Sequence, residues 1–313
     1  MQLRYGRWVR LATVAVLLAG CTPPPPEDIG NRIRVVTTIG MIGDVVEHVG
    51  GDRVSVETLM GPGIDPHLYR ASEGDVRRLF GADVIFFSGL HLEAKMGEVL
   101  DHMTGEMVTV AVTDAIPRAA LLAPPEFAGA HDPHVWFDVE MWAQTLDLVS
   151  ETLSELEPEN AAYFRQNAEE YRAELAELDA YVEQQVARVP PNLRVLVTAH
   201  DAFNYFGEAY GFEVIGLQGI STATEAGTAD VQRLAELLAK RRIPAIFIET
   251  SVPRRTVEAV QAAVQARGFD VKIGGSLFSD AMGNPGTPEG TYIGMVKHNV
   301  DTIVDALTRS ESK

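Results

Sequence analysis

The chain has 313 residues, which is long for one domain and sufficient for two, and its 46% hydrophobic and 22% charged residues are ordinary for a globular protein. Its formal net charge of −18 argues against nucleic acid or anionic lipid as the main partner, because both bind basic patches. An acidic surface favours solubility and also raises the local concentration of cations.

The N-terminus has the pattern of a secretory signal. A basic segment, 1–10, precedes an apolar run, 11–18, which is too short to span a bilayer, and small residues lead into the single cysteine, Cys21. This ending resembles a bacterial lipobox, so we expect a signal peptide over 1–20 and a lipid anchor on Cys21. An ordinary cleaved signal with a chance cysteine is the alternative. The proline-rich segment 21–31 predicts an extended tether.

The remaining chain alternates between β-branched or apolar runs and helical segments, which predicts parallel βαβ units. The predicted strands cover 33–39, 54–59, 84–88, 108–112, 195–198, 213–216, 245–249 and 270–273. Between Ala161 and about Ala187 there is no glycine or proline, and apolar residues recur at steps of three and four, which predicts one long helix. The stripe consists of Tyr171, Leu175, Leu178, Val182 and Val186.

These patterns together predict an α/β fold with two lobes, each a mostly parallel sheet flanked by helices. We expect an N-terminal lobe over 32–157, a linking helix over 158–189 and a C-terminal lobe over 190–313. The prolines at 190 and 191 end the helix.

Three histidines and one aspartate stand in distinctive settings. His67 and His134 each follow an Asp-Pro pair, which presents the histidine from a stiff loop. His200 directly follows a predicted strand, and Asp280 follows another after a short loop. Imidazole nitrogen and carboxylate oxygen are ligands for divalent transition metals, and four of them can close a shell. Since ligands gather beyond the carboxyl ends of parallel strands, each lobe can offer two to a shared cleft.

Six segments carry a resemblance to a known family when they are taken together. They are Gly63 to Tyr69, Asp132 to Asp138, His200 to Phe203 with Tyr205 and Phe206, Ile246 to Glu249, Leu277 to Asp280, and Pro285 to Tyr292. The set resembles the metal-binding receptors of bacterial ABC importers, the zinc/manganese solute-binding (TroA-like) family. The resemblance extends from about Ile33 to Leu307.

The resemblance implies a function and a site. His67, His134, His200 and Asp280 would bind one Zn²⁺ or Mn²⁺ between the lobes. The long helix would act as a stiff spine, so that the lobes move little. The loaded protein, a lipid-anchored monomer in the periplasm or on the cell surface, would deliver its metal to an inner-membrane permease driven by a cytoplasmic ATPase. It would not be an enzyme.

The choice of metal rests on the ligand set. Three imidazoles and a carboxylate suit tetrahedral Zn²⁺, whereas Mn²⁺ prefers more oxygen, which a bidentate Asp280 would help to supply. Manganese-dedicated members of the family commonly carry a carboxylate at the His200 position, and zinc-dedicated members carry a histidine-rich loop, which is absent over 117–130. The Irving–Williams order favours zinc, and we expect zinc to bind more tightly.

Other polar residues are weighed against plainer roles. Asp138, Asp201 and Glu249 are candidates to orient the ligand imidazoles by accepting their second N–H, with a helix cap or a surface charge as the alternative for each. His131 is either a capture ligand or an exposed loop histidine. Trp136 is expected to pack under the site. The histidines read as structural are His48, His91, His102 and His298.

Two other functions compete with the receptor. A secreted zinc hydrolase would need three protein ligands and an open position, with Asp280 as a general base instead of a ligand. The sequence has no His-Glu-x-x-His motif, Gly-x-Ser-x-Gly motif or phosphate-binding glycine loop. A surface adhesion protein with a structural metal would unfold when the metal is removed, whereas a receptor should stay folded.

Overall fold

The computed structural model describes residues 30–127 and 129–308. Its N-terminal lobe is built on a four-stranded parallel sheet with the order β2-β1-β3-β4. The strands are β1 (Ile33–Ile39), β2 (Val54–Met60), β3 (Val84–Phe87) and β4 (Val108–Ala111). Strand β1 lies inside the sheet with six of its seven residues buried, as its β-branched sequence predicts. Val35 pairs with Val56 of β2 on one side and with Val84 of β3 on the other.

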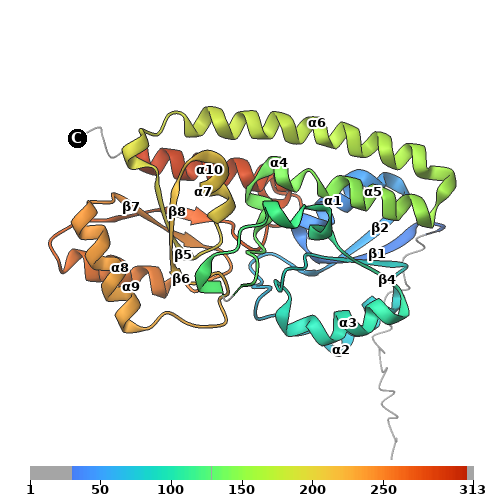
Figure 1. The fold of residues 1–313 in the computed structure, drawn as a ribbon, viewed down its shortest axis with the longest axis horizontal. Helices are drawn as coiled ribbons and strands as arrows, with labels where there is room; N and C mark the ends of the chain where they lie inside the picture. Colours follow the sequence, from blue (N-terminus) through green and yellow to red (C-terminus); the bar gives the residue numbers. More distant parts are fainter. Residues whose placement is uncertain (1–29, 128, 309–313) are drawn as a thin grey trace, which may run out of the picture. The chain divides into compact units, whose positions relative to one another are not determined.

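Helices cover both faces of this sheet (Figure 1). Helices α1 (Gly40–Gly50) and α5 (Thr145–Leu156) lie on the face towards the longest helix, and α2 (Glu73–Gly81) and α3 (Gly97–Glu106) lie on the other. The start of α2 is fixed by a capping box between Ser72 and Asp75. This layering leaves the carboxyl ends of the strands free to carry loops.

The predicted long helix is confirmed as α6, Ala161–Val186. All five residues of the predicted apolar stripe are buried, and Phe164 and Ala168 extend the stripe towards the helix start. The helix packs against α1 and α5 of the N-terminal lobe and against α10 (Tyr292–Thr308) at the end of the chain (Figure 1). It therefore joins the two lobes along its length.

The C-terminal lobe also has parallel strands, arranged as two hydrogen-bonded pairs. Strands β5 (Val195–His200) and β6 (Glu213–Gln218) form one pair, and β7 (Ala245–Glu249) and β8 (Lys272–Leu277) form the other, with β5 lying against β7. The remaining helices are α4 (Val139–Trp142), α7 (Asn204–Tyr210), α8 (Thr228–Arg241) and α9 (Arg255–Gln265). The α/β expectation of two lobes with parallel strands and a long helix is confirmed.

Several strand boundaries differ from the prediction by one or two residues, and those of one strand differ by more. The predicted strand over 270–273 is β8, which begins later and continues to Leu277 through two glycines. A Cβ atom on Gly274 would lie 2.6 Å from Phe247 Cε1 and 2.8 Å from Ala306 Cβ. The glycine is needed because a strand and a helix approach the backbone closely at this point, and it does not mark the end of the strand.

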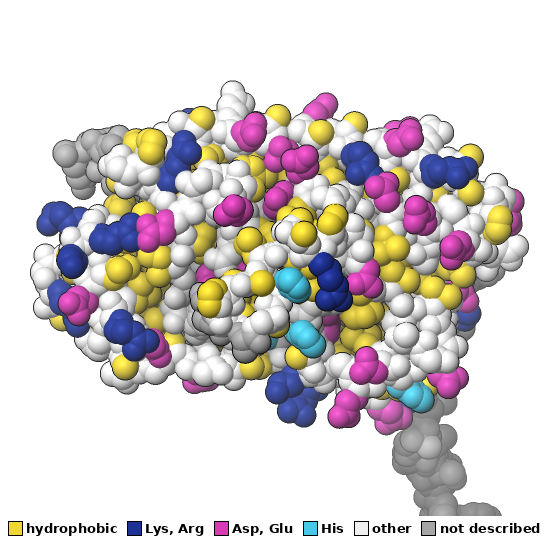
Figure 2. All heavy atoms as spheres, in the orientation of Figure 1, with side chains coloured by type: hydrophobic (Ala, Val, Ile, Leu, Met, Phe, Trp, Pro, Cys, Tyr) yellow, Lys and Arg dark blue, Asp and Glu magenta, His cyan; other side chains and the backbone are white. Residues whose placement is uncertain are grey.

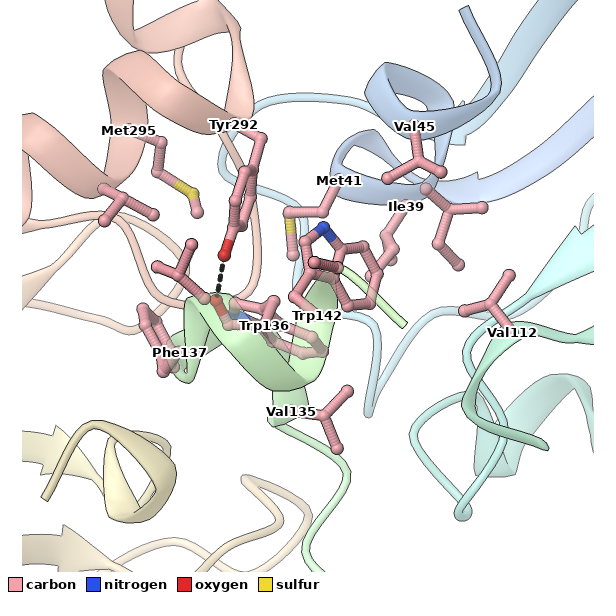
Figure 3. Close-up of a cluster of buried hydrophobic side chains, with 14 of the residues drawn as sticks. Ile39, Met41, Val45, Val112, Val135, Trp136, Phe137, Trp142, Tyr292 and Met295 are labelled. Atoms are coloured by element: carbon pink, nitrogen blue, oxygen red, sulfur yellow. Dashed lines mark hydrogen bonds between the residues drawn. The ribbon is translucent and has the colours of Figure 1, made fainter. Parts of the chain in front are cut away.

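The larger hydrophobic core is continuous across the lobes. It includes strands of the N-terminal sheet, the buried stripe of α6, and residues of α7 and α10. Figure 3 shows Trp136, Trp142 and Tyr292 in this core, with the Tyr292 hydroxyl donating to the Trp136 carbonyl oxygen at 2.7 Å. A second, smaller core fills the C-terminal lobe between its strands and α8 and α9.

Charged side chains are unevenly distributed over the face of the molecule shown in Figure 2. Acidic side chains are spread over α6 and the N-terminal lobe, while several basic side chains gather over the C-terminal lobe (Figure 2). The expected signal peptide, Cys21 and the tether as far as residue 29 lie outside the described residues. Among the helices that the structure describes, none has both the length and the apolar character needed to cross a bilayer.

Candidate metal centre

The structure brings the four sequence-predicted ligand residues together. His67 lies in the loop after β2, and His134 lies at the start of the short 3-10 turn that precedes α4. His200 is the last residue of β5, and Asp280 follows the end of β8 by three residues. Both lobes therefore contribute two side chains, and their ligand atoms all lie within 4.8 Å of one another.

The spacing of these atoms suits a shared metal ion. His67 Nε2 lies 3.2 Å from His134 Nε2. Asp280 Oδ1 lies 3.4 Å from His134 Nε2, and Asp280 Oδ2 lies 3.4 Å from His200 Nε2. A tetrahedron with metal–ligand bonds of about 2.0–2.1 Å has edges of about 3.3–3.4 Å. The three contacts are close to this edge length, and both Asp280 oxygens face imidazole nitrogens.

The four side chains are almost completely shielded from solvent. Their relative exposures are 3% for His67, 0% for His134 and His200, and 1% for Asp280. His200 Nε2 and Asp280 Oδ1 have no hydrogen-bond partner among the described residues. Buried polar atoms without partners are costly, so two of them facing one point indicate a site built for an ion.

Two carboxylates outside this set hold the imidazoles in place. Asp132 Oδ1 lies 2.7 Å from His134 Nδ1, and Glu249 Oε2 lies 2.5 Å from His200 Nδ1. Each carboxylate also accepts the backbone N–H of its histidine, at 3.0 Å and 2.9 Å. With Nδ1 bonded to a carboxylate, Nε2 is left to face the other candidate ligands, which is the tautomer that a metal ligand needs.

The pKa values of His67 and Asp280 are both lowered, but for different reasons. Burial lowers the pKa of His67 to about 3, despite the attraction of the nearby Asp280. Burial opposes the charge on Asp280, but His200 and His134 outweigh it and hold the pKa of this carboxyl well below its usual range. At neutral pH the metal-free site therefore has a neutral His67 and an ionised Asp280.

The pKa values of the other two imidazoles, His134 and His200, are raised. For His134 the burial penalty is outweighed by Asp132 and Asp280, which raise its pKa to about 9. For His200 the burial penalty is outweighed by Glu249 and Asp280, which raise its pKa well above the ordinary value. Both imidazoles therefore carry a second proton and a positive charge at neutral pH in the metal-free protein. A metal that binds their Nε2 atoms must displace these protons.

The three candidate orienting residues differ in what their carboxylates contact. Glu249 contacts His200 as described above. Asp138 takes the capping alternative, because its Oδ1 accepts the Met141 N–H at 2.9 Å at the start of α4. Within the described residues, the Asp201 carboxylate makes no hydrogen bond to a ligand imidazole, although burial raises its pKa. Sequence reasoning missed Asp132, for which the local signal was an aspartate two residues before the histidine, the spacing of an Asx turn.

The remaining aromatic and histidine predictions concern the surroundings of the site. Trp136 is fully buried with its ring 5.2 Å from the His134 ring, and its Nε1 donates to the Ser279 carbonyl oxygen at 3.0 Å. It packs under the site, as expected. The group of four side chains that could hold a metal ion does not include His131.

The fold and this centre together define a two-lobed α/β solute-binding protein with a buried site of three histidines and one aspartate. A family model described as ZnuA, zinc-uptake complex component A, periplasmic, matches residues 35–306. The chain belongs to this family.

Named relatives are similar over nearly all of the chain. The zinc-binding protein TroA of Treponema pallidum is 54% identical over 275 residues, covering 88% of this chain and 89% of that protein. The manganese-binding lipoprotein MntA of Bacillus subtilis is 44% identical over 306 residues, covering 97% of this chain and all of that protein. The solved structure of the periplasmic zinc-binding protein TroA from Treponema pallidum matches with a TM-score of 0.86 over 88% of this chain and 99% of that one.

Proposed function

We propose that this protein is an extracytoplasmic receptor that binds one divalent transition metal between its lobes and delivers it to an ABC transporter. The observation that carries the proposal is the convergence of four buried side chains, two from each lobe, whose ligand atoms all lie within 4.8 Å of one another. His67, His134, His200 and Asp280 are the proposed ligands. The membership of the zinc-uptake family supports this assignment.

The competing functions are less favoured by the geometry. A catalytic zinc keeps one position open for water, whereas four protein donors close the shell. A purely structural metal would be needed to hold the fold together, but this fold has a continuous hydrophobic core between sheet, α6 and α10. We therefore expect the metal-free protein to stay folded.

Zinc is the proposed tighter ligand, with manganese as a second cargo. The three imidazole nitrogens and the Irving–Williams order both favour Zn²⁺. Both carboxylate oxygens of Asp280 face imidazole nitrogens, which also offers Mn²⁺ an additional oxygen. The relatives named for zinc and for manganese support considering both metals.

The proposed organisation follows from the same role. Residues 1–20 would be removed as a signal peptide, Cys21 would carry a lipid anchor, and 21–31 would act as a tether. The lobes would span 32–157 and 190–313, with the linking helix over 158–189. The partners would be an inner-membrane permease and its cytoplasmic ATPase, approached by a monomeric receptor. A relative named as a lipoprotein supports the anchor.

The test is a calorimetric titration of the chelator-stripped mature protein with Zn²⁺ and then with Mn²⁺. We expect saturable one-to-one binding by a folded protein, weakened at least about 100-fold in His200→Ala because a buried ligand is lost. The matched control is His102→Ala, since His102 is an exposed histidine on α3. Absence of binding, or unfolding of the stripped protein, would reject the receptor. Equal effects of the two substitutions would reject the ligand assignment.

A further inference from the structure

The two Asp-Pro-His segments of the N-terminal lobe use one oxygen of their aspartates in the same way. Asp65 Oδ1 accepts the backbone N–H of His67 at 2.9 Å, and Asp132 Oδ1 accepts that of His134 at 3.0 Å. This turn fixes each histidine relative to its aspartate within one loop. A carboxylate has two oxygens, so the Oδ2 atom of each aspartate is left to bond elsewhere.

The Oδ2 atom of each aspartate is bonded to the other lobe. Asp65 Oδ2 accepts from the Thr222 hydroxyl at 2.6 Å, and Asp132 Oδ2 accepts from Asn204 Nδ2 at 3.0 Å. Thr222 lies in the segment between β6 and α8, and Asn204 is the first residue of α7. These two interlobe hydrogen bonds therefore join each loop that carries a candidate ligand to a side chain of the C-terminal lobe.

The interlobe hydrogen bonds lie where they contribute strongly to closure. Thr222 and Asp132 are both buried, so water does not readily replace their partners. A hydrogen bond to a carboxylate is stronger than one between neutral groups, and breaking it leaves a buried charge short of a donor. A movement that separates the two lobes at the site must break both bonds.

The loop that carries His67 is placed to make such a movement. Its side chains Ile64 and Leu68 are exposed, so this side of the loop faces solvent. Ile64 N–H donates to the Gly61 carbonyl oxygen at 3.2 Å, and Leu68 N–H donates to that of Asp65 at 3.4 Å. These bonds join residues of the same loop and can move with it. A displacement away from the other lobe must, however, break the bond between Asp65 and Thr222.

We propose that Thr222 and Asn204 are positioning residues that hold the two ligand-carrying loops closed against the C-terminal lobe and thereby slow the exchange of metal. This inference rests on the proposed function, because it takes His67 and His134 as metal ligands. Thr222 and Asn204 act through the aspartates, so their bonds must break when a metal enters and again when it leaves. They should therefore slow both binding and release, and change the ratio of the two rates, the dissociation constant, less.

The first test compares Thr222→Val, which replaces a hydroxyl by a methyl group of similar size, with Thr224→Val at an exposed position of the same segment. Zn²⁺ release into excess chromogenic chelator is measured by stopped flow. Zn²⁺ binding is followed by tryptophan fluorescence, since the Trp136 ring lies 5.2 Å from the His134 ring. We expect Thr222→Val to raise both rate constants at least about 10-fold, the effect of one hydrogen bond to a charged group. Thr224→Val should leave both unchanged.

The second test applies the same measurements to Asn204→Ala, with the exposed Asn192→Ala as its control. Both rate constants should again rise in Asn204→Ala only. In the combined Thr222→Val and Asn204→Ala protein the two increases should multiply, because one opening breaks both bonds. Melting temperatures are measured in parallel, since a merely structural role would lower them without raising both rates.

Two results would overturn the proposal. One is unchanged exchange rates in Thr222→Val and Asn204→Ala. The other is faster release with an unchanged binding rate in both variants, which would show that these residues only orient the ligands. Failure of the unmodified protein to bind Zn²⁺ would instead reject the proposed function.

Discussion

Metal binding at neutral pH should release about two protons, and Asp132→Asn should reduce this number to about one. In the metal-free protein the pKa of His134 is about 9, that of His200 is raised well above its ordinary value, and that of His67 is about 3. The first two imidazoles must each lose a proton to bind a metal, whereas His67 is already neutral. Affinity should therefore fall about 100-fold for each pH unit below pH 8.

Asp132→Asn separates two effects of the Asp132 carboxylate: its charge raises the pKa of His134, and its hydrogen bond orients the His134 imidazole. Without its charge, burial and Asp280 remain, and the pKa of His134 falls from about 9 towards or below the ordinary value of about 6.5. At pH 7 this removes a proton competition of roughly 100-fold, which offsets the roughly 10- to 100-fold loss expected when an orienting carboxylate is neutralised. Affinity at pH 7 should change little, while at pH 9 the variant should bind about 10- to 100-fold more weakly.

The assay is calorimetry of Zn²⁺ binding in several buffers that differ in ionisation enthalpy, because the dependence on buffer gives the number of protons released. The matched control is Asp138→Asn, which changes a helix cap and contacts no ligand imidazole. It should release two protons, as the unmodified protein does. An Asp132→Asn protein that still releases two would refute the reasoning that the Asp132 charge holds the His134 proton.

Three further outcomes concern stability. Leu175→Ala should lower the free energy of unfolding by about 2–5 kcal/mol in urea titrations, because Leu175 is buried on α6. The control Glu177→Ala, at an exposed position of the same helix, should change it by less than about 0.5 kcal/mol. Similar losses in the two variants would show that the apolar stripe of α6 is not part of the core. Tyr171→Phe removes a hydroxyl that donates to the buried Asp44 and should cost about 1–3 kcal/mol in the same titrations. Zn²⁺ at 100 times its dissociation constant should add about 2.7 kcal/mol, seen as a higher melting temperature that a chelator reverses.

The fold was predictable from the sequence where local pattern decides it. Strands β1 and β7 occupy the predicted residues, and α6 follows from the spacing of its apolar residues. The end of β8 was not predictable, because Gly274 reads as a break in the strand pattern. Its reason for being glycine is the approach of Phe247 and Ala306, which come from elements distant in sequence. A contact of this kind is defined only when the elements are packed.

The site, like the fold, could be predicted from the sequence only where its contacts are local. The Asp-Pro-His spacing around Asp132 and His134 is local, and its Asx-turn geometry could have identified Asp132 as the orienting carboxylate. The same spacing at Asp65 has another use, because its free oxygen accepts from Thr222 and not from the imidazole of His67. Sequence spacing alone cannot separate these two outcomes, since the deciding partner comes from the other lobe.

The shared core also limits how the metal can enter and leave. The buried Asp44 of α1 accepts from the Tyr171 hydroxyl of α6 and from the Tyr292 backbone N–H of α10, so one carboxylate joins three helices from both lobes and the spine. A wide hinge opening would separate these groups and leave a buried charge without its donors, at a cost of several kcal/mol. The four proposed ligands are closed to solvent, so exchange of a metal would still require movement. The less costly movement is a small displacement of the loops that carry the ligands, which supports the view of α6 as a stiff spine.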